Sequence, residues 1–144
     1  LFEYCLRFDK ASLSSLEVTP EEIEEAFSLV DEAFLDTLRE AAANITAFHE
    51  KQKRTSFIIN EKDGVIIGQK ITPIEKVGLY VPGGTAAYPS TVLMDAIPAK
   101  IAGCDKIVMV TPPGKDGKIN PKGMGRVNGT EVIVPAQSAL IMHQ

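Results

Sequence analysis

The feature that most constrains the fold is a strand, a glycine turn, a helix and a second strand in close succession. Residues 77–84 begin with strand-forming side chains and end in two adjacent glycines. An apolar helical segment follows at residues 90–102, and Gly103 is placed to end it. Residues 106–111 then have the composition of a second buried strand. Two strands joined by a helix predict parallel pairing and a right-handed crossover.

The two glycines after the first strand suit the edge of a ligand crevice. In open α/β sheets, ligands bind beside the carboxyl ends of the strands. Bare backbone at Gly83 and Gly84 lets a planar or phosphorylated ligand come close. The spacing differs from the G-x-G-x-x-G dinucleotide fingerprint. On the residues alone, a tight turn that needs positive φ is the alternative, and general turn preferences favour it.

The N-terminal third of the chain predicts helices. The run Thr19-Pro20-Glu21-Glu22 offers a capping threonine, a proline for the first helical position and a glutamate that completes a capping box. Along residues 23–48, apolar side chains recur at steps of three and four, which predicts one continuous helix of about eight turns. Residues 1–10 have the pattern of another helix that is already under way at Leu1.

The rest of the chain is typical of an α/β protein. Two β-branched runs at 57–59 and 65–67 flank a turn that contains Asp63-Gly64, which predicts a β-hairpin. The predicted fold is a long N-terminal helix and a hairpin followed by an incomplete Rossmann-like parallel sheet. We divide the chain into a helical segment, 1–56, and an incomplete α/β domain, 57–144, within one compact unit. Residues 131–134 predict a third parallel strand.

Composition limits the classes of function. A hydrophobic content of 44% and a charged content of 24% are ordinary for a globular protein. The net charge of −4 argues against a nucleic-acid partner, and no apolar run is long enough for a membrane span. Cys5 and Cys104 lie far apart without metal-site spacing, as expected for reduced cysteines in a cytoplasmic protein. A disulfide between them is the alternative.

Six short segments carry a resemblance to a known family. They are Phe2-Glu3-Tyr4, Phe8-Asp9-Lys10, residues 77–84, Ser90-Thr91-Val92-Leu93-Met94, Ile101-Ala102-Gly103-Cys104 and Pro112-Pro113. In order and spacing they resemble L-histidinol dehydrogenase over residues 1 to about 121. The resemblance implies NAD-dependent oxidation of L-histidinol to L-histidine, in histidine biosynthesis, by a dimeric enzyme that binds zinc.

The resemblance also implies roles for individual residues. Tyr80 matches an NAD-contacting tyrosine, and Pro82 with the two glycines would form the pocket floor. A tyrosine packed at the sheet edge is the alternative for Tyr80. Phe8 matches a phenylalanine near the same cofactor, with plain core packing as its alternative. Gln137 corresponds to a glutamine that contacts NAD, but two glycines that precede it in the family are missing, so an exposed helix residue is the alternative.

Catalytic residues are not expected in this chain. The zinc ligands and the catalytic Glu-His pair of the family lie beyond the region of resemblance. His49 and His143 stand in no matching motif, and Ser90 and Thr91 suit helix capping. We therefore expect an N-terminal portion, truncated at both ends, that keeps part of the NAD crevice without catalytic or zinc-binding residues. The alternatives are a non-catalytic binding or oligomerisation module and the product of a broken gene.

Overall fold

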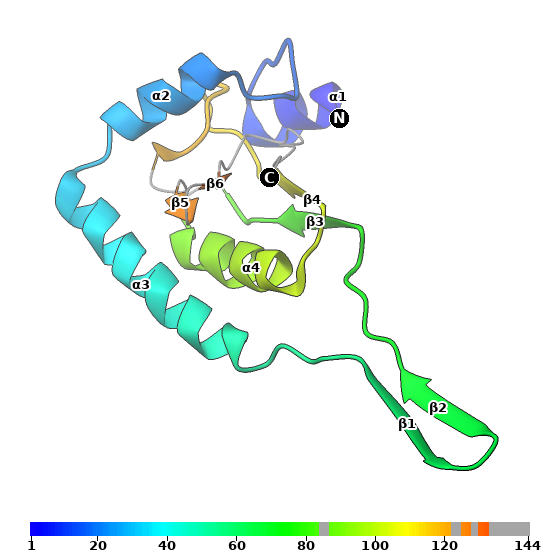
Figure 1. The fold of residues 1–144 in the computed structure, drawn as a ribbon. Helices are drawn as coiled ribbons and strands as arrows, with labels where there is room; N and C mark the ends of the chain where they lie inside the picture. Colours follow the sequence, from blue (N-terminus) through cyan, green and yellow to red (C-terminus); the bar gives the residue numbers. More distant parts are fainter. Residues whose placement is uncertain (84–86, 122–124, 128–129, 133–144) are drawn as a thin grey trace.

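Helices and short strands follow one another along the chain, and Figure 1 shows them in sequence order. The computed structural model describes residues 1–83, 87–121, 125–127 and 130–132, the last two segments as backbone alone. The helices are α1 (Phe2–Tyr4), the π-helical turn η1 (Cys5–Asp9), α2 (Pro20–Ser28), α3 (Glu32–Glu50) and α4 (Pro89–Ala102). The strands are β1 (Phe57–Lys62), β2 (Val65–Gln69), β3 (Lys76–Tyr80), β4 (Lys106–Val110), β5 (Gly125–Val127) and β6 (Thr130–Val132). The predicted α/β class is confirmed.

The strand–helix–strand unit in the middle of the chain has the predicted topology. β3 and β4 pair in parallel, from Lys76 opposite Lys106 to Tyr80 opposite Val110. Gly103 ends the connecting helix α4 with φ of 87°, a left-handed conformation that glycine adopts without steric cost. Because the strands are parallel and in register, their carboxyl ends lie together at one end of the sheet.

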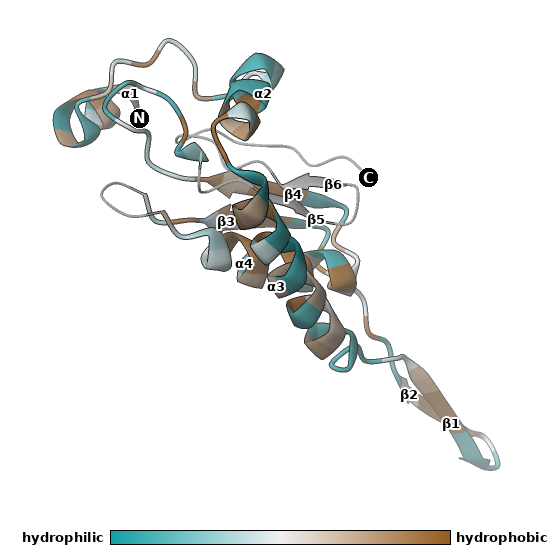
Figure 2. Cartoon of the chain, turned by 90° about the vertical axis from the view of Figure 1, so that its left-hand side faces the viewer, coloured by the Kyte–Doolittle hydropathy of each residue, from teal (hydrophilic) through white to brown (hydrophobic). Residues whose placement is uncertain are grey.

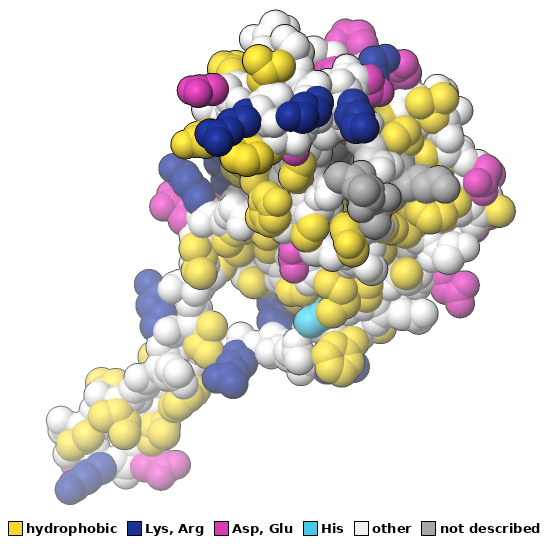
Figure 3. Space-filling model, turned by 180° about the vertical axis from the view of Figure 1, so that it is seen from behind, with side chains coloured by type: hydrophobic (Ala, Val, Ile, Leu, Met, Phe, Trp, Pro, Cys, Tyr) yellow, Lys and Arg dark blue, Asp and Glu magenta, His cyan; other side chains and the backbone are white. Residues whose placement is uncertain are grey.

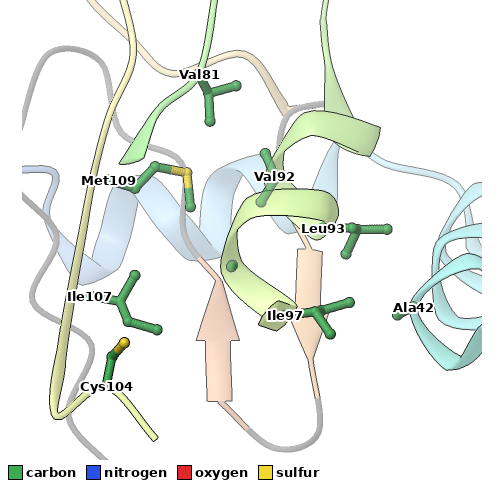
Figure 4. Packing of buried hydrophobic residues seen from close by; sticks show 9 residues of the cluster. Ala42, Val81, Val92, Leu93, Ile97, Cys104, Ile107 and Met109 are labelled. Carbon is green, nitrogen blue, oxygen red and sulfur yellow. The ribbon is translucent and has the colours of Figure 1, made fainter. Parts of the chain in front are cut away.

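The main core lies around α4, which separates the strands from α3 (Figures 1 and 4). Val92 and Ile97 of α4 are 1% and 2% exposed. Ile107 and Met109 of β4 approach α4 from one side, and Ala42 of α3 approaches it from the other. A helix that is apolar on several sides is expected to be buried in this way. The helix α4 therefore joins the helical layer to the sheet.

Two helices replace the single long helix that the apolar spacing predicts, so that prediction is wrong. α2 ends at Ser28, and α3 begins at Glu32. Asp31 caps the second helix, because the backbone N–H of Phe34 donates to its Oδ1 at 2.8 Å. A side chain that accepts this bond favours a new helix start over continuation of the old one.

The two helices bury their apolar faces in different places. In α2, Ile23 and Ala26 pack with Val18 and Ile119, and we call this group the satellite core. In α3, Ala42 belongs to the main core. The apolar stripe is thus continuous in the sequence and divided in space. The break between the helices lets each half reach its own partner elements.

Two other N-terminal predictions are confirmed. The capping box at the start of α2 is complete: Thr19 Oγ1 accepts from the Glu22 amide at 3.3 Å, and Glu22 Oε2 accepts from the Thr19 amide at 2.9 Å. Residues 2–9 are helical, as α1 and η1, and Lys10 follows as the C-cap with φ of 61°.

The predicted hairpin is present and projects away from the rest of the molecule (Figures 1 and 2). β1 and β2 pair antiparallel, with Phe57 opposite Gln69 and Ile59 opposite Ile67. Gly64 takes φ of 75° in the connecting turn. Every residue of the two strands is exposed.

The third parallel strand predicted at residues 131–134 is wrong. The strand at this position, β6, pairs antiparallel with β5, and Arg126 lies opposite Glu131. The sequence between the two strands is Asn128-Gly129, a pair that favours tight hairpin turns. Residues 133–144 lie outside the described part of the chain.

Candidate functional site

A groove lies beyond the carboxyl ends of β3 and β4. Its volume is about 230 Å³, and its walls come from three segments. Residues 81–83 follow β3, residues 87 and 88 precede α4, and the third wall lies between residues 111 and 121 after β4. This is the edge at which open α/β sheets bind their ligands. The groove therefore lies where the glycine turn predicts a ligand crevice.

Tyr80 is the last residue of β3 and stands just before the groove. Its neighbours Leu79 and Val81 pack in the main core, so the alternation of side chains along a strand turns Tyr80 to the opposite face. The residue is 62% exposed, and it is not among those that line the groove. Its ring is thus open to solvent beside the groove and is not packed into the interior.

The glycine at position 83 has a reason within the fold. A Cβ there would lie 2.9 Å from the carbonyl oxygen of Pro112, 3.1 Å from Pro112 Cδ and 3.1 Å from Thr111 Oγ1. A side chain cannot lie that close to a backbone oxygen unless the chain shifts, so the segment after β4 favours a residue without a side chain at Gly83. Pro82, beside it, is exposed at the groove, and Gly84 lies outside the described residues.

Sequence reasoning missed two side chains of the groove. Tyr88 is 43% exposed and occupies the N-cap position of α4 without a side-chain cap. Thr111, directly after β4, is buried at 5% exposure in the groove wall. The position of each beside a predicted element end was the available signal. The expectation that Ser90 and Thr91 cap α4 is wrong, because both lie within its first turn after Pro89.

The charges at the groove mouth are engaged with the protein itself. Lys118 Nζ donates to both carboxylate oxygens of Glu25 at 2.6 Å. This hydrogen bond, with a smaller Coulombic contribution, raises the pKa of Lys118 above its ordinary value. Asp116 Oδ1 accepts from the backbone amide of Lys118 at 3.1 Å. The ion pair ties the segment after β4 to α2 and directs the ammonium toward Glu25.

Two further site candidates remain, Phe8 and Gln137. Phe8 is 65% exposed on η1, so the core-packing alternative is wrong for this residue. Its ring stacks on that of Tyr4 with centroids 6.0 Å apart, and the Arg7 guanidinium lies 5.2 Å from its centroid. Phe8 does not line the groove. Gln137 lies outside the described residues.

The described residues contain no group of three or more His, Cys, Asp or Glu side chains able to hold a metal ion. His49 Nδ1 is hydrogen-bonded to Gln52 Oε1 at 2.7 Å. Cys5 and Cys104 are buried free thiols, so the disulfide alternative is wrong. These donors do not fit a zinc site. Over the same described ranges, no helix is long and apolar enough to cross a membrane.

The fold and the groove define a class: an α/β protein with a parallel strand–helix–strand unit and a groove at the carboxyl ends of its strands. The family model described as "Histidinol dehydrogenase" matches residues 1–133. The chain belongs to the histidinol dehydrogenase family. The resemblance noted in the sequence is thereby confirmed.

Relatives and a solved structure support the same assignment. The histidinol dehydrogenase of Listeria innocua is 55% identical over 128 residues, which are 89% of this chain and 30% of that protein. That of Clostridium acetobutylicum is 51% identical over 84% of this chain and 28% of its own length. The crystal structure of histidinol dehydrogenase from Elizabethkingia anophelis matches with a TM-score of 0.81 and 43% identity, over 85% of this chain and 28% of that one. The chain thus spans under a third of the length of these proteins.

Proposed function

We propose that this chain forms part of the NAD crevice of a histidinol dehydrogenase, an oxidoreductase of histidine biosynthesis that converts L-histidinol to L-histidine. The observation that carries the proposal is the exposed ring of Tyr80 at the carboxyl end of β3, one residue before a groove that Pro82 and Gly83 help to line. Membership of the histidinol dehydrogenase family supports the proposed reaction and the proposed cofactor. The groove and the exposed ring support a cofactor position at this edge of the sheet.

The residues around the groove suit a flat, amphipathic cofactor. An exposed tyrosine ring offers a stacking surface and a hydroxyl that donates a hydrogen bond. Pro82 and Gly83 line the groove with little side-chain bulk, which leaves room for the cofactor. When bound, NAD accepts the hydride that leaves the substrate. In this proposal Tyr80, Pro82, Gly83 and Gly84 hold and orient the cofactor, with Phe8 and Gln137 as further contacts.

Catalysis itself is assigned to residues outside this chain. The donor set in the described residues does not fit zinc, so we derive no step through that ion. We propose that the zinc ligands and the general base belong to the part of the enzyme beyond this chain. The chain on its own is then inactive. Within the whole enzyme it works in the cytoplasm as part of a homo-oligomer, and it binds neither nucleic acid nor membrane.

Calorimetric titration of NAD into the 144-residue chain tests the cofactor role. We expect saturable binding that Tyr80→Ala weakens by about tenfold, because loss of a stacked aromatic ring costs about 1.5 kcal/mol. Tyr80→Phe separates the ring from the hydroxyl. Phe48→Ala, which removes an equally exposed aromatic ring from α3, should leave the affinity unchanged. Absence of saturable binding, or equal binding by the Tyr80→Ala protein, contradicts the proposal.

A second role, as an oligomerisation module, is supported by a separate observation. The β1–β2 hairpin carries large apolar side chains that are 39% to 77% exposed (Figure 3). Exposed apolar surface of this kind marks contact sites for other protein surfaces. This role is compatible with the first, because the hairpin and the groove do not share residues.

A further inference from the structure

Thr111 stands out because, within the described ranges, it is the only polar residue that is buried, at 5% exposure. It comes directly after β4 and forms part of the groove wall. Its hydroxyl has no hydrogen-bond partner among the described residues. Burial of an unpaired hydroxyl costs free energy, because the group gives up hydrogen bonds to water and gains none. An unpaired buried group of this kind calls for an explanation.

Packing gives no reason for a hydroxyl at this position. Side chains on a strand alternate between two faces, and Ile107 and Met109 of β4 approach α4 from the same face (Figure 4). Thr111 is the next residue on that face and continues an apolar row. Val81, which follows β3 as Thr111 follows β4, is apolar and 1% exposed. A valine would fill the place of Thr111 with nearly the same shape, so the hydroxyl has a role other than packing.

The hydroxyl of Thr111 lies where a ligand in the groove can reach it. A Cβ added at Gly83, another residue of the groove wall, would lie 3.1 Å from Thr111 Oγ1. Tyr88, at the start of α4, brings a second hydroxyl-bearing side chain to the same groove. Prolines and aliphatic residues form most of the remaining wall. A few hydrogen-bonding groups on an apolar wall are typical of ligand pockets, where they fix the orientation of the ligand.

Charge and size narrow the choice of ligand. Asp116 gives the groove a carboxylate, whereas the ammonium of Lys118 is directed to Glu25. A phosphate would therefore meet a negative charge without a free cation in the groove wall, whereas an uncharged group would not be repelled. The groove volume of about 230 Å³ lies below the roughly 300–1,000 Å³ of pockets for drug-sized ligands, so the groove holds one part of a dinucleotide. An uncharged nucleoside fits both limits, and its ribose and base offer hydrogen-bonding groups.

We propose that Thr111 contacts the cofactor, and that its hydroxyl forms a hydrogen bond with a nucleoside portion of NAD in the groove. This inference rests on the proposed function and adds a directional contact to the stacking surface of Tyr80. A threonine hydroxyl can donate to the ligand or accept from it. The cofactor thus supplies the partner that the hydroxyl lacks within the described chain. The phosphates of NAD lie outside the groove, away from Asp116.

Thr111→Val separates a ligand-binding hydroxyl from a structural one, because the two roles predict opposite changes in stability. Removal of an unpaired buried hydroxyl should leave the midpoint of thermal unfolding of the free chain unchanged or raise it by up to about 4 °C. The same substitution should weaken NAD binding, measured by calorimetry, by about fivefold, which is the effect of one neutral hydrogen bond. Thr111→Ser keeps the hydroxyl and should retain the affinity of the unchanged chain within about twofold.

Thr46→Val is the matched control. The hydroxyl of Thr46, on α3, donates to the carbonyl oxygen of Ala42 at 2.7 Å, and this residue does not line the groove. Its replacement should leave the NAD affinity unchanged and should not raise the unfolding midpoint. Titration of adenosine and of nicotinamide riboside identifies the half of the cofactor that occupies the groove, because the affinity for one of the two should fall about fivefold in the Thr111→Val protein.

Unchanged NAD affinity of the Thr111→Val protein overturns this inference. A fall in its unfolding midpoint does so too, since the hydroxyl would then support the fold, and equal affinity of the unchanged and Thr111→Val proteins for both nucleosides has the same meaning. If Tyr80→Ala weakens NAD binding and Thr111→Val does not, this inference fails and the proposed function stands. If NAD does not bind to the unchanged chain, both fail.

Discussion

Gly83 and Gly78 differ in what surrounds them, although both belong to the same family-like run. A Cβ added at Gly83 would lie 2.9 Å from the carbonyl oxygen of Pro112, whereas a Cβ added at Gly78 would have no atom within 4 Å. One glycine is thus required by packing, and the other is not. This difference gives a matched pair of positions within six residues of chain.

Gly83→Ala should destabilise the chain by about 1–3 kcal/mol, because the added methyl forces apart two backbone segments that are in contact. Urea unfolding followed by circular dichroism measures the change. Gly78→Ala is the control and should alter the free energy of unfolding by less than about 1 kcal/mol, since it fills open space and restricts the unfolded chain. Equal effects of the two substitutions would argue against close packing at Gly83.

The sequence placed Gly83 shortly after the strand, but Gly83 lies in no assigned turn and lacks the positive φ of the tight-turn alternative, and its contact with Pro112 was not predicted. The contact with Pro112 joins the ends of two parallel strands, and it depends on a register that local sequence does not specify. Phe8 illustrates the same limit. Its apolar character is compatible with a core, yet η1 leaves it exposed, because burial depends on what packs against the helix.

At the scale of elements, an apolar contact and an ionic contact join α2 to the segment after β4. Ile119 is 5% exposed in the satellite core. Lys118, next to it, pairs with Glu25, and both of those side chains are about half exposed, at 48% and 49%. Exposed ion pairs add little to stability, whereas a buried aliphatic side chain adds much.

Ile119→Ala should therefore lower the free energy of unfolding by about 2 kcal/mol or more, because it leaves a cavity beside α2. Lys118→Met keeps the aliphatic stem and removes the charge, and it should have a much smaller effect. Thermal unfolding followed by circular dichroism compares the two proteins. A larger loss from Lys118→Met would mean that the ion pair, and not the apolar contact, attaches α2.

Element types were more predictable than element boundaries. The Thr19 capping box, the hairpin turn and the Gly103 stop depend on local chemistry, and each was found where the sequence indicated it, whereas the expected caps Ser90 and Thr91 were not. The division between α2 and α3 was missed because the apolar spacing runs on through it. Asp31 carried the missing signal, as a capping residue inside an otherwise regular pattern.

At the scale of the whole molecule, stability is concentrated in the main core and not in the β1–β2 hairpin. Ile97→Ala should cost about 2–5 kcal/mol in dilute solution, because the side chain is 2% exposed between two layers. Ile66→Ala, on the hairpin, removes the same atoms at 77% exposure and should change the free energy of unfolding by no more than about 0.5 kcal/mol. Chemical unfolding of both proteins measures the difference. Similar losses would mean that the hairpin packs on the body of its own chain.

The parallel unit was predictable at this scale, because a helix between two strands leaves few other topologies. The position of β6 could not be predicted, because an apolar strand pattern does not indicate which strand it pairs with or whether the pairing is parallel or antiparallel. The position of the groove could be predicted from the topology. Its charged side chains could not, because Lys118 comes from a segment that carries no sequence motif.

The break between α2 and α3 has a consequence for motion. Each helix has its own cap and its own apolar partners, so α2 and the satellite core can open while α3, α4 and the strands stay closed. Local unfolding of that kind would release Ile119 and widen the entrance to the groove, whose wall includes the same residue. If the groove binds NAD as proposed, entry of the cofactor would then depend on local unfolding of α2 and the satellite core. The sheet that supports the groove would not have to move.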